Sequence, residues 1–178
     1  MQITINEKKS DQFANEIVNV FYQNKGLVKN PQAKLKNSLG ELKTYIAIGA
    51  VLFLLMGGMA ILWGAEALTI IAMVLMVLII AISLRLYFRL NGMAKAITSD
   101  PRSSVLTVDE TGLTLARDGS EGQTLPWENV AFVRCFAESV CALPNDQKGY
   151  ILAVPIAHKD EVLAAVKMVR PDTTIIGA

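Results

Sequence analysis

The sequence predicts an α+β membrane protein in which a two-helix transmembrane hairpin carries a small antiparallel β domain that a C-terminal helix closes. The first observation is that only one charged residue, Glu66, lies between Thr44 and Leu84. The second is an alternation of apolar and polar residues from Ser103 onward, which is typical of half-buried strands. The third is a change to helical periodicity near His158.

The distribution of charge divides the chain into four segments. Of its 178 residues, 52% are hydrophobic and 19% are charged, which is more apolar than an average soluble domain. The excess of apolar residues is confined to one block. We therefore predict an N-terminal segment with a basic juxtamembrane linker (1–43), a transmembrane hairpin (44–88), a linker (89–102) and a C-terminal domain (103–178).

The N-terminal segment is expected to form a strand and an amphipathic helix. Gln2–Asn6 alternates in polarity, and Ser10 is a suitable N-cap for the helix that follows. The helix either packs on the C-terminal domain or lies on the membrane surface. Packing is favoured because cations are lacking inside the expected helix and come only before it, at Lys8 and Lys9, and after it. Its apolar face is predicted to contain Phe13, Ile17, Val20 and Phe21, and its end is expected among Gly26, Asn30 and Pro31.

The apolar block is long enough for two membrane crossings, at about 45–63 and 68–88. The first of these has 19 uncharged residues, which rise about 28 Å as a helix and match the hydrocarbon core of a bilayer. The short break Gly64–Ala67 cannot recross a bilayer. The two spans are therefore expected to be antiparallel neighbours.

Basic and aromatic residues flank this block in a pattern that predicts its orientation. Eight Lys and Arg residues lie in 25–43 and 85–95, whereas Gly64–Ala67 contains none. Because basic loops stay in the cytoplasm, we expect both termini there, with the cations also attracting anionic lipids. The expected membrane-interface residues are Tyr45, Trp63, Tyr87, Phe88, Lys43, Arg85 and Arg89.

Short strands separated by turn residues are expected in the C-terminal domain. Asp109–Gly112 is expected to be a turn in which Gly112 can take a positive φ, and Asp118-Gly119 marks a hairpin. The strands are expected at 104–109, 113–116, 123–127, 130–136 and 150–154. A helix from about 158 to 169 is expected to cover the sheet with Val162, Leu163, Val166 and Val169.

The order of these elements resembles the YcxB-like family of bacterial membrane proteins. The resemblance is carried by the turn Asp109-Glu110-Thr111-Gly112-Leu113, the step Trp127-Glu128-Asn129-Val130, the step Val154-Pro155 and their spacing around the hairpin. It implies a C-terminal domain similar to bacterial pleckstrin-homology-like (PH-like) folds, a place in the bacterial inner membrane and no established enzymatic activity. The tail Arg170–Ala178 runs past the usual end of the family's last helix.

The residues that could carry chemistry are few and scattered. Cys135 and Cys141 would share a face if one strand held both, and with His158 they are the candidates for a metal site or a thiol nucleophile. Their spacing is typical of neither, so we expect no metal, no cofactor and no enzyme. Trp127 is expected to anchor the core or an edge, and Trp127 with Glu128 is the candidate interaction surface.

The expected function is therefore that of a membrane-anchored, non-enzymatic interaction or regulatory module. Its partners would be membrane lipids and either a protein or a second copy of the chain. The residues from Ala96 onward are acidic, with seven Lys and Arg against eleven Asp and Glu, which argues against nucleic acid. Two alternatives stay open: a membrane-bound enzyme that uses Cys135, Cys141 or His158, and a membrane-state sensor that acts through Asn91–Pro101.

Overall fold

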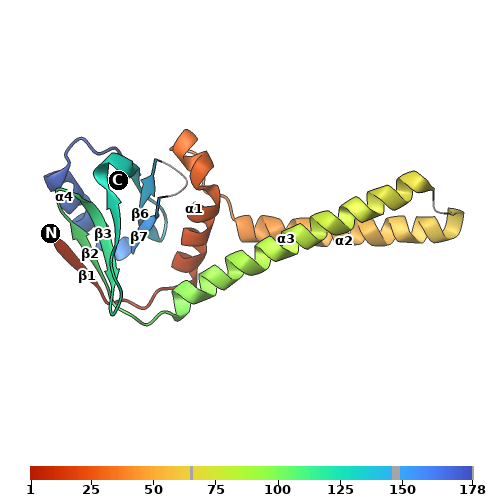
Figure 1. The fold of residues 1–178 in the computed structure, drawn as a ribbon, viewed down its shortest axis with the longest axis horizontal. Helices are drawn as coiled ribbons and strands as arrows, with labels where there is room; N and C mark the ends of the chain where they lie inside the picture. The colour runs from red at the N-terminus through yellow and green to blue at the C-terminus, as the bar shows by residue number, and fades with distance from the viewer. Residues whose placement is uncertain (65, 146–148, 178) are drawn as a thin grey trace. The chain divides into compact units, whose positions relative to one another are not determined.

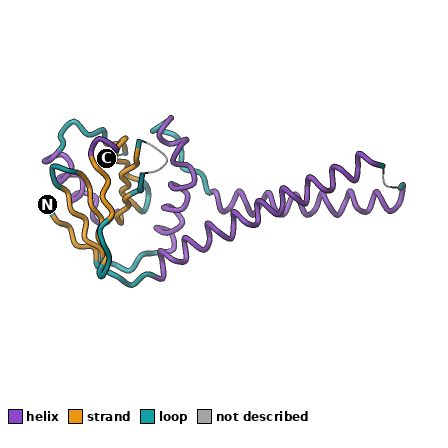
Figure 2. The backbone as a smooth tube through the Cα atoms, in the orientation of Figure 1, coloured by secondary structure: helices purple, strands orange, loops and turns teal. Residues whose placement is uncertain are grey.

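The computed structural model describes residues 1–64, 66–145 and 149–177, apart from the side chain of Trp63. The chain forms two compact units. We call Met1–Leu35 with Ala94–Ala178 the β unit, and Lys36–Met93 the hairpin unit. Figure 2 shows the strands, in orange, within the β unit, whereas the hairpin unit is built from helices.

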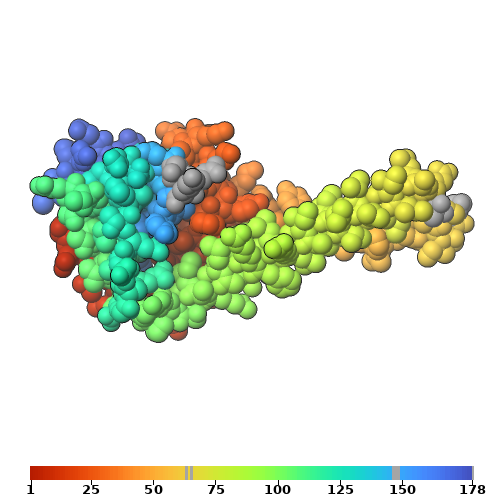
Figure 3. Space-filling model, viewed as in Figure 1, coloured from red at the N-terminus to blue at the C-terminus, as the bar shows by residue number. Residues whose placement is uncertain are grey.

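Two long helices form the hairpin unit: α2, Ser38–Trp63, and α3, which spans Ala67–Ser99 and ends in the β unit. Both are long and apolar enough to cross a membrane, and none of the most apolar stretch of either helix is buried within the protein. The prediction of two such helices is confirmed. Figures 1 and 3 show α2 and α3 as two long neighbouring helices.

Two contacts show that α2 and α3 run in opposite directions. The Lys43 ammonium lies 5.6 Å from the centre of the Tyr87 ring. A Cβ atom placed on Gly57 would lie 3.8 Å from Met73. The residue numbers in each pair add to the same value, which is the relationship expected of an antiparallel pair.

The predicted linker 89–102 is mostly helix, because α3 continues without interruption to Ser99. Nothing between Phe88 and Ser99 ends a helix strongly. Pro101 does so, since a proline disfavours helical conformation at the residue before it, here Asp100. The end of α3 is therefore set by a proline. The distribution of charge predicted only the uncharged part of this helix, which could lie in a membrane.

The first helix of the hairpin also begins earlier than predicted. α2 starts at Ser38 rather than near Tyr45, inside the segment assigned to the N-terminus. The Asn37 side chain caps it by accepting a 3.0 Å hydrogen bond from the backbone N–H of Gly40. A capping residue thus decides where the helix begins.

The first sheet of the β unit is antiparallel, with strand order β1-β2-β3-β4 (Figure 1). β1 spans Gln2–Ile5 and pairs with β2, Ser104–Val108, so the N-terminal strand joins the C-terminal domain. β3 spans Gly112–Arg117, and β4 spans Gln123–Pro126. These strands were predicted, although Trp127 lies in a short 3-10 helix, Trp127–Asn129 (η1).

Two glycines in this sheet have different roles. Gly119 has a φ of 74° in the hairpin turn between β3 and β4, as its Asp-Gly sequence indicates. Gly112 does not take the positive φ that was considered for its turn. Gly112 is needed because a Cβ there would collide with the backbone carbonyl of Leu125 on the paired strand β4.

The second sheet has the order β7-β6-β5-β8. β5, Val130–Cys135, and β7, Leu152–Pro155, were expected. β6, Ser139–Pro144, was missed because each of its residues is buried, which removes the alternation that identifies a half-exposed strand. β8, Ile175–Ile176, places the C-terminal tail parallel to β5.

Both sheets and helix α4, Lys159–Val169, share one apolar core. A 3-10 turn, Ile156–His158 (η2), leads into the helix. Val162, Ala165 and Val166 are buried in the core, and Leu163 and Val169 pack against it, so the predicted helix face is confirmed. The helix closes the space between two sheets rather than covering a single one.

Helix α1, Asp11–Lys29, packs on the second sheet. Ser10 caps it as predicted, and the helix continues through Gly26. Val20 and Leu27 are buried against β5 and β6, whereas Phe21 is 49% exposed and does not belong to the packed face. Packing on the domain was the favoured interpretation, and the structure shows it.

Candidate functional site

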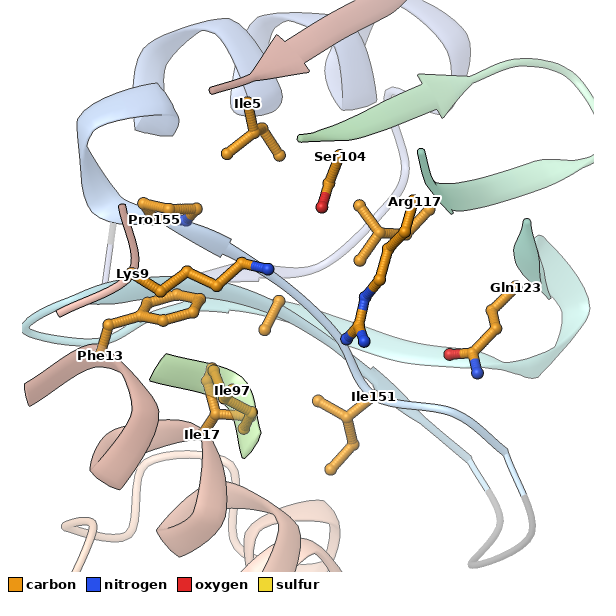
Figure 4. A pocket seen from close by; sticks show the side chains of 12 residues that line it. Ile5, Lys9, Phe13, Ile17, Ile97, Ser104, Arg117, Gln123, Ile151 and Pro155 are labelled. Carbon is orange, nitrogen blue, oxygen red and sulfur yellow. The ribbon is translucent and has the colours of Figure 1, made fainter. Parts of the chain in front are cut away.

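A small pocket lies within the β unit, where the first sheet, strand β7 and helix α1 meet (Figure 4). Its volume is about 80 Å³. Its apolar lining comes from Phe13, Ile17, Ile97, Ile151 and their neighbours. The polar lining residues are Lys9, Ser104, Arg117 and Gln123.

Strand register places two of these polar residues side by side. Ile5 pairs with Ser104, and Ser104 pairs with Arg117, so the three side chains lie in one row on the same face of the sheet. The next row on that face contains Ile3 and Leu106, which are buried in the core. The apolar face of the sheet therefore becomes polar at its last row.

Lys9 enters the pocket from the segment that joins β1 to α1. Figure 4 shows its side chain and that of Arg117 approaching each other from opposite walls, with the Ser104 hydroxyl pointing into the space between them. Partial burial and the neighbouring Arg117 lower the pKa of Lys9. The folded protein thus holds an ammonium group beside another cation at an electrostatic cost.

The carboxylate of Asp100 lies near these cations, and two arginine side chains donate hydrogen bonds to it. Arg102 donates to its two oxygens at 2.8 and 3.0 Å, and Arg117 donates to one of them at 3.3 Å. These hydrogen bonds, those from Arg102 first, keep the pKa of Asp100 well below its usual value, so it stays ionised. Asp100 neutralises one cation of the three.

Lys9 and Ser104 keep unused hydrogen-bonding capacity. Within 1–64, 66–145 and 149–177, neither side chain makes a hydrogen bond, and Lys9 makes no ion pair. Arg117 uses one of its five N–H donors on Asp100. An arrangement of cations and a hydroxyl around a small space suits the binding of an anion.

The predicted membrane-interface residues lie in the hairpin unit, and all except Trp63, the last residue of α2, lie toward the same end of it. Lys43 on α2 approaches Tyr87 on α3, and Tyr87 contacts Phe88 edge-to-face with ring centres 5.7 Å apart. Tyr45 and Phe88 are exposed by 59% and 65%. Arg85 and Arg89 are exposed as well, whereas the side chain of Trp63 lies outside the described part of the chain.

Trp127 belongs to the core rather than to a surface. Its side chain is 8% exposed, and its indole Nε1–H donates a 2.7 Å hydrogen bond to the backbone carbonyl of Asp109. Glu128 beside it is exposed, and its backbone carbonyl accepts a hydrogen bond from Asn145. Of the two candidate interaction residues, only Glu128 offers its side chain to a partner.

The two cysteines occupy neighbouring strands and opposite faces of the second sheet. Cys135 on β5 pairs with Val140, and Arg134 pairs with Cys141 on β6. The condition for a shared face, that one strand holds both, is not met. Burial raises the pKa of Cys135, and it raises that of Cys141 to about 12, so neither thiol is activated as a nucleophile.

His158 stands apart from this chemistry as the residue that precedes α4. Its Nδ1 lies 3.5 Å from a carboxylate oxygen of Glu161. Among the residues that the structure describes, no three His, Cys, Asp or Glu side chains are grouped so as to hold a metal ion. The three candidate residues are therefore not brought together as a catalytic or metal-binding set.

Sequence reasoning did not find the pocket residues Lys9, Ser104 and Arg117. A signal existed in the strand pattern, since Ser104 and Arg117 occupy positions at which the apolar face of β2 and β3 would continue. This signal could be used only once the register of the two strands was known.

No protein-family model, curated protein or solved structure matches this chain.

Proposed function

We propose that this protein is a membrane-anchored, non-enzymatic interaction or regulatory module whose hairpin unit spans a bacterial inner membrane. The observation that carries the proposal is that no residue in the most apolar stretch of α2 or of α3 is buried within the protein. The apolar helix of a soluble core is buried by its own protein, whereas these two helices have no such cover. A bilayer supplies it.

The orientation rests on the flanking charges. Lys and Arg residues lie before α2, in its first turns and in the C-terminal half of α3. The connection between the two helices contains none. The proposal therefore places both termini, and the β unit with them, in the cytoplasm. The cation–aromatic contact between Lys43 and Tyr87 suits the headgroup level on that side.

The β unit supports the proposed relation to PH-like folds and to the YcxB-like family. The support is that the strands enclose an apolar core that helix α4 closes, although they form two sheets rather than one. In that proposal the β unit presents a binding surface, and the hairpin unit keeps it at the membrane. The raised thiol pKa values and the scattered candidate residues disfavour the alternative of a thiol enzyme.

The anchor is tested by expressing the full chain in bacteria with a reporter fused after Ala178. We expect the protein in the membrane fraction, resistant to alkaline carbonate, with a cytoplasmic reporter active and a periplasmic reporter silent. The matched control replaces the β-branched and leucine residues of α3 by serine, which should release the protein. Full-length protein that stays monodisperse in buffer without detergent would overturn the proposal.

The interaction role is tested by crosslinking in intact membranes. An interaction module should give crosslinked species that contain either a second copy or a partner protein, and replacing exposed Glu128 by lysine tests whether that side contributes. Recovery of uncrosslinked monomer alone, at every crosslinker length and concentration, would count against the role.

A sensor is a second candidate because α3 is one uninterrupted helix from Ala67 to Ser99. A continuous helix can transmit movement, which a flexible linker of the predicted kind would absorb. Exchanging residues 44–88 for an unrelated hairpin should abolish the response of a sensor to lipid composition. If the response to lipid composition persisted after the exchange, the sensor would be ruled out and only the anchoring role would remain.

A further inference from the structure

We propose that the pocket lined by Lys9, Ser104 and Arg117 binds a phosphate group. The inference goes beyond the anchoring role and does not depend on membrane insertion, because every lining residue belongs to the β unit. It rests on three features of the pocket: a positive charge that is not neutralised, donors that have no partner, and a fitting size.

The charge is the first feature. Lys9, Arg102 and Arg117 carry three positive charges around the single carboxylate of Asp100, so the cluster has a net charge of +2. Burial and the neighbouring Arg117 disfavour the charged form of Lys9, although Asp100 favours it. A bound anion would offset this effect.

The donors are the second feature. Lys9 and Ser104 are without hydrogen-bond partners in the described ranges, and Arg117 keeps further N–H groups. They come from the β1–α1 connection, from β2 and from β3, so they surround the space rather than line one side of it (Figure 4). Donors from several directions suit a tetrahedral phosphate better than a planar carboxylate.

The size is the third feature. The pocket has a volume of about 80 Å³, which leaves room for a group larger than one water molecule, such as a phosphate. Phe13, Ile17 and Ile151 form an apolar wall beside it, which suits the organic part of a phosphate ester. The phosphate can belong to a lipid headgroup or to a soluble phosphorylated molecule.

The test measures binding of inorganic phosphate to the full-length protein in a neutral detergent by titration calorimetry. We expect saturable binding at millimolar phosphate, because one site supplies two cations and a hydroxyl. Lys9→Gln should weaken binding about ten-fold, the effect of losing one charged hydrogen bond. Lys9→Arg should largely retain it.

Lys8→Gln is the matched control, since Lys8 is an exposed neighbour that does not line the pocket. It removes the same charge and should change affinity less than two-fold. Because Lys9 is held beside a cation, Lys9→Gln should melt no lower than the unsubstituted protein, which separates lost binding from lost folding. Absence of phosphate binding, or equal losses in Lys8→Gln and Lys9→Gln, would overturn the proposal.

A second arm identifies the source of the phosphate. The protein is placed in nanodiscs of phosphatidylcholine, with or without phosphatidic acid, and the titration with inorganic phosphate is repeated. Competition by phosphatidic acid that Lys9→Gln abolishes assigns the pocket to a lipid headgroup. Unchanged binding of inorganic phosphate in both nanodiscs supports the proposal with a soluble phosphorylated ligand.

Discussion

The carboxylate of Glu16 accepts a 2.6 Å hydrogen bond from the hydroxyl of Ser139, although 123 positions separate the two residues. The same carboxylate accepts the backbone N–H groups of Ala137 and Glu138 at 3.1 and 3.0 Å. One side chain of α1 therefore satisfies three donors, two in the turn between β5 and β6 and one at the first residue of β6. This contact fixes the N-terminal helix to the second sheet.

Replacing Glu16 by alanine is expected to destabilise the β unit by about 1–3 kcal/mol, because Ser139 is fully buried and its hydroxyl loses its acceptor. The midpoint of urea denaturation of the full chain in detergent measures the effect. Glu121→Gln, at an exposed loop position, is the control and should leave the midpoint unchanged. Similar midpoints for both variants would show that the contact contributes nothing.

The pH dependence of stability is expected to depend on Asp109. Its Oδ1 accepts hydrogen bonds from the Thr111 hydroxyl, the Thr111 N–H and the Gly112 N–H, and these bonds lower its pKa below the usual 3.8. A carboxylate with a lowered pKa in the folded state stabilises the fold above its unfolded pKa. That contribution is lost as the pH falls through the folded value.

We therefore expect the unfolding free energy to fall as the pH is lowered from about 5 toward 2, with a shallower fall in Asp109→Asn. Asparagine keeps the acceptor oxygen but does not titrate. Urea denaturation at several pH values, followed by tryptophan fluorescence, gives the slopes. The control is Asp118→Asn in the exposed β3–β4 turn, and a slope for Asp109→Asn equal to that of the control contradicts the prediction.

The two thiols are expected to react at different rates. Cys141 is fully buried with a pKa raised to about 12, so at neutral pH it is protonated and unreactive. Cys135 is partly exposed and its pKa is raised less. Iodoacetamide should modify Cys135 slowly and Cys141 only after unfolding.

Peptide mass spectrometry of the protein, sampled during alkylation with and without denaturant, measures both rates at once. The denatured sample provides the reference rate for each cysteine. Modification of Cys141 in the folded protein at the rate of an unstructured thiol would contradict the environment described here. It would also return Cys141 to consideration as a nucleophile.

The packing of the hairpin is expected to depend on Gly49 and not on Gly58. A Cβ atom on Gly49 would lie 2.9 Å from Cγ1 of Ile80, whereas one on Gly58 would meet nothing within 4 Å. Gly49→Leu should therefore separate the helices and destabilise the hairpin by about 1–3 kcal/mol, as overpacking does in other interiors. Gly58→Leu is the matched control.

Thermal melting of both variants in the same detergent compares them directly. The melting temperature should be lower for Gly49→Leu than for Gly58→Leu. If the order were reversed, the close approach of α2 and α3 at Ile80 would not hold in the folded protein. If the two were equal, the glycine would have no packing role.

The sequence by itself determined the hairpin and most of the strands. Between Thr44 and Leu84 the absence of charge is a local property, and no distant residue is needed to recognise two long apolar helices there. The same is true of the turn at Asp118-Gly119 and of the amphipathic helix α4. Each is specified by residues that are close in the chain.

The tertiary structure decided what lies between these elements. β6 shows no alternation of apolar and polar residues because both of its faces are covered. The exposure of Phe21 follows from how α1 packs on that strand. The indole of Trp127 became a core anchor because the carbonyl of Asp109 lies within its reach. None of these neighbours is local in sequence.

The candidate pocket shows the same division most clearly. Lys9 and Arg117 are separated by more than a hundred positions, and Ser104 joins them only because β2 pairs with β1 on one side and with β3 on the other. Periodicity indicates which residues share a face of one strand. The register between strands, which depends on the packing of the whole core, determines which residues meet across them.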